Sequence, residues 1–227
     1  LESFARKAYR RPVESDEVQR LMQIHERALA RGSSPAQAVK LAMKAALVSP
    51  NFLFRVEKEP AGAEPRPLDD FELASRLSYF LWASMPDDRL FELAARKTLH
   101  RKEVLEREVR RMLADAKAGA YYESFAGQWL GVTKLKSNLQ PDPGKFPNFT
   151  PALRDAMIEE PIVFFAHLIR EDRSLLDLLN GDYVYVNEEL ARHYGLEAVK
   201  GNEFRRVSVS DRNRGGVLGM AGVLTTV

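Results

Sequence analysis

The 227-residue sequence contains no cysteine. This absence excludes disulfides, thiolate zinc sites, cysteine nucleophiles and a Cys-x-x-Cys-His haem attachment from the chain. Long apolar runs are also missing, and no stretch approaches the roughly 20 apolar residues that a membrane-spanning helix needs. No signal peptide is recognisable, because the sequence begins at Leu1 with residues that already have a helical pattern. We therefore expect a piece of a longer polypeptide, with no membrane span in this segment.

No strong excess of charge of either sign is present. The sequence has 34 basic residues against 32 acidic residues, which gives a formal net charge of +2. The basic pairs are scattered along the chain, at Arg10-Arg11, Arg110-Arg111 and Arg205-Arg206. They are not interleaved with aromatic residues as in a nucleic-acid-binding strand, so the sequence argues against nucleic acid as a partner.

The familiar short motifs of catalysis and metal binding are missing as well. The four histidines are His25, His100, His167 and His193, and no pair of them has a local ligand spacing. The sequence contains no His-Glu-x-x-His, no Gly-x-Ser-x-Gly, no P-loop and no dinucleotide fingerprint. Arg214-Gly215-Gly216 could offer backbone donors to an anion, but a turn or close backbone packing explains a single Gly-Gly pair better. We predict no metal site, and the residues alone fix no catalytic set.

Helical periodicity and helix-capping residues dominate what is present. Ser34-Pro35 and Thr150-Pro151 each place a capping hydroxyl before a proline, which is typical of a helix start. Pro161 lies inside the helix that begins at Thr150, and we expect it to kink that helix. Asn187 is expected to cap a short helix that ends at Gly195.

Two short stretches near the C-terminus have strand-like alternation, at residues 182–186 and 204–209. The sequence therefore predicts a mainly α protein, a multi-helix orthogonal bundle with a small β element near the C-terminus. Three prolines and a glycine between residues 59 and 67 indicate a linker. We predict a small helical domain at 1–58, this linker at 59–67, a main helical domain at 68–203 and the start of a truncated C-terminal domain at 204–227.

The adjacent pair Glu159-Glu160 has two interpretations. On a helix the two side chains point about 100° apart, so Glu160 could face the core while Glu159 faces water. A buried Glu160 would have a raised pKa and could serve as a general acid or base. Burial statistics favour the other interpretation, in which both carboxylates belong to a solvated acidic turn.

Several phrases of the sequence carry a family resemblance. They are FARKAYRRPVESDEV, PLDDFELASRLSYFLWASMPDDRLFELA, ESFAGQWLGV, PDPGKFPNFTPALRDAM, FFAHLIREDRSLLDLLNGDYVYVNEELARHYG and FRRVSVSDRNRGGVLGMAGVLT. Together they resemble the large exported bacterial proteins, abundant in planctomycetes, that join several domains of unknown function to a planctomycete-type cytochrome c module. The chain resembles two of the unknown-function domains and the start of a third.

The resemblance implies export, and it implies that haem c lies only in a separate module, so that this segment has no cofactor of its own. The implied partners are the other domains of the same polypeptide, among them the cytochrome c module. One departure concerns the Phe164-Phe165 pair. The family has a polar, Glu-Thr-Glu-like run before this pair, whereas this sequence has Glu160-Pro161-Ile162. A polar site built by that run would be altered here.

Two hypotheses for function follow from the resemblance. In the first, the chain is the non-haem part of a redox protein, and it binds a substrate or docks the cytochrome module. The candidate pocket residues are then Trp129, Asp142, Asp182, Asn187, His193, Tyr194 and Arg214. In the second, the chain is a helical interaction or scaffold module without catalytic activity. The second is slightly favoured for the isolated chain, because no catalytic set is visible.

Overall fold

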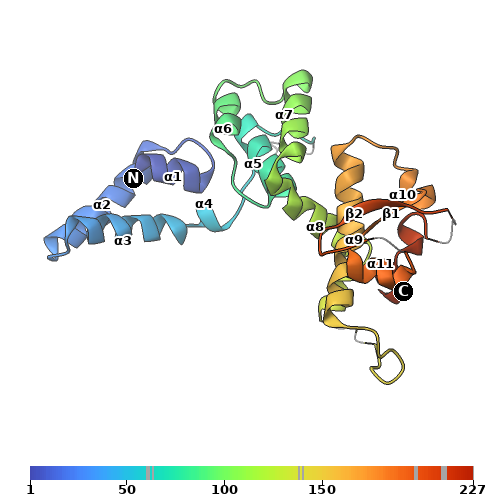
Figure 1. Ribbon diagram of the computed structural model, residues 1–227. Coiled ribbons are helices and arrows are strands. Elements are labelled where there is room, and N and C mark those ends of the chain that lie inside the picture. Colours follow the sequence, from blue (N-terminus) through green and yellow to red (C-terminus); the bar gives the residue numbers. More distant parts are fainter. Residues whose placement is uncertain are drawn as a thin grey trace. The chain divides into compact units, whose positions relative to one another are not determined.

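The computed structural model describes residues 1–59, 62, 64–137, 139, 141–196, 199–210 and 214–226. They form two compact units, Leu1–Arg111 and Met112–Val227, and helix α7 crosses the division between them. The described residues are mainly helical, with a single two-stranded sheet near the C-terminus (Figure 1). This arrangement confirms the predicted fold class. No helix among the described residues is long and apolar enough to cross a membrane.

The regular elements that the structure describes in the first unit are all helices. They are α1 (Glu2–Tyr9), α2 (Ser15–Ala30), α3 (Pro35–Leu47), α4 (Pro50–Leu53), α5 (Asp70–Trp82), α6 (Asp88–Ala95) and α7 (Lys102–Ala114). Helices α2 and α3 pack as a hairpin (Figure 1). The turn between them needs Gly32, which has a positive φ of 84°, and α3 then begins with the predicted Ser34 cap.

A buried arginine joins the two ends of the small N-terminal helical region. Arg10 is only 5% exposed, and its Nη2 donates to the carbonyl oxygens of Asn51, Phe52 and Phe54 at 2.9, 3.1 and 2.9 Å. These carbonyls lie at the C-terminal end of α4, where a helix leaves its carbonyl groups without internal partners. The guanidinium therefore satisfies the end of α4 and holds it against α1.

The second unit mixes helices with the sheet. Its elements are η1 (Ala116–Ala118), α8 (Gly119–Trp129), η2 (Val132–Lys136), α9 (Pro151–Arg170), α10 (Asp177–Asn180), β1 (Tyr183–Val186), α11 (Glu188–Tyr194), β2 (Arg205–Ser208), η3 (Val217–Gly219) and α12 (Ala221–Thr226). Thr150 caps α9 as predicted, and the helix continues through Pro161 to Arg170. The loop at residues 141–149 extends beyond the start of α9 (Figure 1).

Helix α9 is the centre of this unit. It packs against α8, β1, α11, α12 and η2, and most of its apolar side chains are buried. Strand β1 pairs antiparallel with β2, with Tyr183 opposite Ser208 and Val186 opposite Arg205. All four β1 side chains are buried, whereas β2 is largely exposed. The boundaries predicted at 58, 67 and 203 stay a prediction, but β2, η3 and α12 all belong to the compact unit built on α9.

Candidate functional site

Glu160 lies on α9 with its side chain fully buried. Its Oε2 atom accepts a hydrogen bond from the Tyr194 hydroxyl at 2.6 Å, and that hydroxyl in turn accepts one from the Ala221 amide at 2.7 Å. The favoured sequence interpretation, a solvated acidic turn, is therefore wrong for Glu160. The side chain faces inward because α11 and α12 both pack on this part of α9. Glu159, the next residue back, is exposed.

The surroundings of Glu160 favour its neutral form. Burial raises its pKa to about 8, although the hydrogen bond from Tyr194 and the Arg214 charge act in the opposite direction. Glu160 is therefore mostly a carboxylic acid at neutral pH. Because Oε2 receives the Tyr194 hydrogen, the acid proton belongs on Oε1. That atom is buried and has no hydrogen-bond partner among the described residues.

Two of the predicted pocket residues act on this carboxyl group, Tyr194 through its hydrogen bond and Arg214 through its charge, and the exposed His193 lies beside Tyr194. The Arg214 guanidinium lies 4.6 Å from the centre of the Tyr194 ring, and the His193 ring centre lies 5.7 Å from the same ring. Burial and the neighbouring Glu160 raise the pKa of Tyr194, so its hydroxyl keeps its proton. Desolvation, followed by the Arg214 charge, lowers the pKa of His193. We name Glu160, His193, Tyr194 and Arg214 the Glu160 site.

Local sequence features explain how these residues meet. Asn187 caps α11 through its side chain, and Gly195 ends the helix with a φ of 70°, so Tyr194 is the last residue of α11. Pro161 has no amide N–H, which leaves the Met157 carbonyl without its usual helical partner. Gly222 of α12 packs directly on that carbonyl, since a Cβ on Gly222 would lie 2.2 Å from the Met157 oxygen. This close approach brings the start of α12 to Tyr194.

The other four predicted residues lie elsewhere and have local roles. Asn187 caps α11, and Asp142 accepts from the Gly144 amide at 2.8 Å within its loop. Asp182 is exposed, and its carbonyl accepts from Val209 at 2.8 Å beside the sheet. Trp129 ends α8, is 56% exposed and packs 5.9 Å from the Phe125 ring. The structure therefore does not bring these residues to the Glu160 site.

The sequence allows a buried Glu160 but does not place this residue in the predicted pocket. A spacing signal was available. Met157, Glu160 and Phe164 are three and four residues apart, so on a helix they share one face with buried apolar neighbours. The part played by the Ala221 amide could not be predicted from the sequence. This backbone group bonds to a side chain 27 positions away, and such a contact leaves no local sequence pattern.

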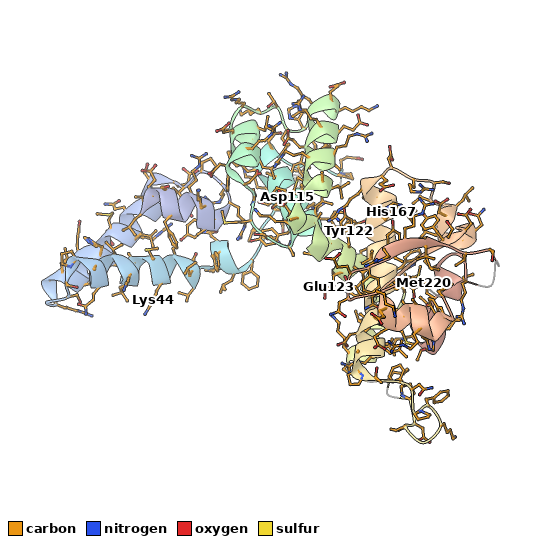
Figure 2. All side chains as sticks on the ribbon, viewed as in Figure 1. Lys44, Asp115, Tyr122, Glu123, His167 and Met220 are labelled. Carbon is orange, nitrogen blue, oxygen red and sulfur yellow. The ribbon has the colours of Figure 1, made fainter. Side chains whose placement is uncertain are left out.

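A second polar cluster of this unit lies between α9 and β1, around His167 (Figure 2). The Tyr183 hydroxyl donates to Asp177 at 2.9 Å, and the Arg206 guanidinium lies 4.1 Å from the Tyr183 ring centre. His167 packs against Tyr183 and Tyr185, and its buried Nε2 has no partner within the described residues. Burial lowers the pKa of His167 and raises that of Tyr183 to about 12, so both side chains are neutral at pH 7. These contacts hold β1 against α9.

Metal binding finds no support in the part of the chain that the structure describes. There, no three histidine, aspartate or glutamate side chains gather closely enough to hold a metal ion. Glu160 has a tyrosine and an arginine as its polar neighbours rather than further carboxylates. The arrangement can instead donate a hydrogen bond or exchange a proton at Oε1.

Comparisons with known proteins agree with this chain being built from uncharacterised domains. Residues 1–57 match the family described as PSD5, a protein of unknown function (DUF1595). Residues 68–196 match the family described as PSD4, a protein of unknown function (DUF1592). No curated protein and no solved structure gives a significant match. The second family match covers more than half of the sequence and contains α5 to α11, so the chain belongs to the DUF1592 (PSD4) family of proteins of unknown function.

Proposed function

We propose that the chain is the non-haem, ligand-binding region of an exported polypeptide that also carries a cytochrome c module. In this proposal the ionised form of Glu160 accepts the proton that a bound hydroxyl group loses as it is oxidised, while the electrons pass to the haem module outside the segment. The observation that carries the proposal is the buried Glu160 carboxyl, whose Oε1 has no partner among the described residues. Native proteins rarely leave such a group unsatisfied without a functional reason.

The chemistry of the site suits this role. A carboxyl group with a pKa of about 8 holds a proton at neutral pH and can release it at little cost. The Arg214 charge lies close enough to lower the pKa of Glu160, so it favours the ionised form that accepts the proton. The Tyr194 hydroxyl donates to Oε2 in either state. Tyr194 and Arg214 are thus positioning groups for the Glu160 proton.

The test uses the full-length polypeptide with its haem module. Haem absorption spectra are recorded while monosaccharides, sugar alcohols and phenols are added one at a time, to wild type and to Glu160→Gln. We expect at least one compound to reduce the haem of the wild type, and we expect Glu160→Gln to slow that reduction at least tenfold. Glu159→Gln, the exposed neighbour, is the matched control and should behave as wild type. Equal rates in wild type and Glu160→Gln would rule out a proton-exchange role.

A second candidate function is a helical interaction or scaffold module without chemistry of its own. Its specific support is an exposed apolar surface where η3 packs on α10. Four leucines of these elements and of the turn before α10 are between 63% and 66% exposed, namely Leu175, Leu176, Leu179 and Leu218. If the chain is a scaffold, we expect that no added compound changes the pKa of Glu160. NMR of carbon-13-labelled glutamate measures this pKa directly.

A further inference from the structure

A groove of about 840 Å³ lies within the first unit, far in sequence from the Glu160 site. Three segments line it: residues 9–14 after α1, residues 51–58 at and after α4, and residues 69–76 at the start of α5. Its volume is within the range of about 300–1,000 Å³ that is typical of small-molecule sites. None of the residues predicted from sequence as a pocket lies here.

The walls of the groove are held by charged side chains with fixed partners. Glu17 binds Arg11 through two hydrogen bonds of 2.9 Å and also accepts from the Asn51 side chain at 3.0 Å. Elsewhere in the lining, Glu57 binds Arg76 through bonds of 2.9 and 2.7 Å. The groove is therefore a preorganised surface and not a gap between loosely packed segments.

The acidic groups that line the groove are already engaged. Besides Glu57, Glu72 binds Arg66 at 2.6 Å and accepts from the Lys58 amide at 2.9 Å. Asp69 caps α5, and Glu14 forms the capping box of α2. Each of these carboxylates has a cation or helix amides beside it, so they leave no uncompensated negative charge to attract a cation.

Two lining cations, Arg10 and Arg55, remain without a carboxylate partner among the described residues. Arg55 is exposed, and its guanidinium lies 4.7 Å from the centre of the Tyr79 ring. Within the described residues no carboxylate lies at salt-bridge distance from it. The ring attracts the guanidinium through a cation–π contact, and the N–H groups of an arginine form a planar fork that matches a carboxylate. Arg10 lies behind it, 5.6 Å from the same ring, and adds positive charge without an acidic partner.

Apolar side chains stand beside this fork. Phe54 is 62% exposed and Val56 is 71% exposed, and both line the groove on either side of Arg55. From these observations we propose that the groove binds a monoanionic carboxylate on an apolar body, with Arg55 clamping the carboxylate and Phe54 and Val56 contacting the apolar part.

The carboxylate can come from a free organic acid or from the C-terminus of a peptide, and two probes separate these sources. We would titrate the 227-residue chain with 3-phenylpropionate and with N-acetyl-glycyl-phenylalanine, following amide chemical shifts by NMR. The corresponding amides serve as uncharged controls. We expect saturable binding of at least one acid, and at least tenfold weaker binding of its amide. Shifts that do not saturate, or equal binding of acid and amide, would overturn the proposal.

Variants locate the site. Arg55→Ala should weaken binding of the acid at least tenfold, and Arg55→Lys, which keeps the charge but loses the fork, should fall between this variant and wild type. Arg20→Ala is the control, because Arg20 pairs with Asp16 on the exposed side of α2 and does not line the groove. Circular dichroism establishes that each variant is folded. If folded Arg55→Ala or folded Arg55→Lys bound as well as Arg20→Ala, Arg55 would not be the clamp.

Discussion

Glu108 and Glu160 are both fully buried carboxyl groups, and their neighbours give them opposite charge states. Burial opposes the ionisation of Glu108, yet hydrogen bonds from Arg89 and Arg111 hold its pKa below the ordinary value. Glu160 has a tyrosine hydroxyl in place of two guanidinium groups, so burial prevails and raises its pKa to about 8. Two guanidinium partners therefore keep Glu108 charged, whereas deep burial with a tyrosine hydroxyl as hydrogen-bond partner keeps Glu160 neutral.

Glu160 should make the free energy of unfolding depend on pH. The ordinary pKa of a glutamate side chain is 4.5, and that of Glu160 in the folded chain is about 8. Between these values the folded state holds a proton that the unfolded state has lost, so stability falls as pH rises, by at most ~1.4 kcal/mol per pH unit. Glu160→Gln cannot ionise, and the variant should gain stability relative to wild type from pH 5 to pH 9. Urea unfolding at several pH values measures the difference.

Glu159→Gln provides the control for this titration. Desolvation and the nearby Glu123 also raise the pKa of Glu159, but its side chain is exposed and it should contribute a much smaller slope. If the stability curves of wild type and Glu160→Gln ran parallel from pH 5 to pH 9, the assignment of a protonated, buried Glu160 would be wrong.

Tyr194→Phe removes the hydroxyl that connects Glu160 to Ala221. The change leaves Glu160 Oε2 and the Ala221 amide without this partner, and it should lower the free energy of unfolding by about 2–4 kcal/mol. It should also raise the pKa of Glu160, since the lost hydrogen bond favoured the carboxylate. Carbon-13 NMR of the glutamate side chains measures this pKa. A lower pKa in Tyr194→Phe would contradict the hydrogen-bond assignment.

At the scale of elements, the chemistry of helix ends made much of the fold predictable. Ser34 and Thr150 each accept a hydrogen bond at the start of their helices. Helix α11 begins after Asn187 and ends before Gly195, as predicted. At the start of α2, Glu14 is the N-cap and completes a capping box with Glu17. These features depend on neighbours within four residues, which is why the sequence reveals them.

The Glu160 site was harder to predict because it joins distant segments. Glu160 meets Tyr194 from 34 positions away, and Tyr194 meets Ala221 from 27 positions away. Helical spacing places Glu160 on an apolar face of α9. The carboxyl group is buried only because α11 and α12 pack over this part of the face, and the local sequence does not show that packing. Asp142, Asp182 and Asn187 are polar residues within the phrases that carry the family resemblance. The side chains of Asp142 and Asn187 bond to nearby backbone groups, and such local bonds do not reveal which distant segments a residue meets in the folded chain.

Gly222 controls how closely α12 approaches α9. A Cβ at this position would lie 2.2 Å from the Met157 oxygen, so Gly222→Ala must displace α12. We expect a loss of roughly 2–4 kcal/mol of stability, comparable with other severe steric changes in a core. Thermal and urea unfolding measure it. Gly119→Ala is the matched control, because a Cβ there meets nothing within 4 Å and the helical position should gain about 0.4–1 kcal/mol.

An ion network joins α6 to α7 in the first unit. Glu108 accepts from Arg89 at 2.7 Å and from Arg111 at 2.7 Å, and Arg111 also binds Asp87 at 2.8 Å. Glu108→Gln should destabilise the chain by roughly 2–3 kcal/mol. This loss is smaller than that expected from breaking a fully buried ion pair, because the Arg89 side chain is 51% exposed. The effect should be present at pH 7 and shrink below pH 4.5, as the wild-type carboxylate gains a proton. An effect that persists unchanged at low pH would contradict an ionic origin.

For the whole molecule, the family matches and the compact units divide the chain differently. The DUF1592 match, residues 68–196, crosses the division between Arg111 and Met112. It also ends before β2, η3 and α12, although β2 pairs with β1 and Ala221 binds Tyr194. The matched region thus needs the following residues to cover β1 and Glu160. Stability should accordingly follow the compact units rather than the family boundaries.

The two tryptophans allow this expectation to be measured, since the sequence has one in each unit. Trp82 is 4% exposed in the first unit, and Trp129 is 56% exposed in the second. Trp129→Phe leaves Trp82 as the only tryptophan, and Trp82→Phe leaves Trp129. Adding Gly222→Ala should lower the urea midpoint reported by Trp129 and leave the Trp82 midpoint nearly unchanged, whereas Glu108→Gln should do the reverse. Coincident shifts of both midpoints would instead show that α7, which crosses the division, makes the two units unfold together.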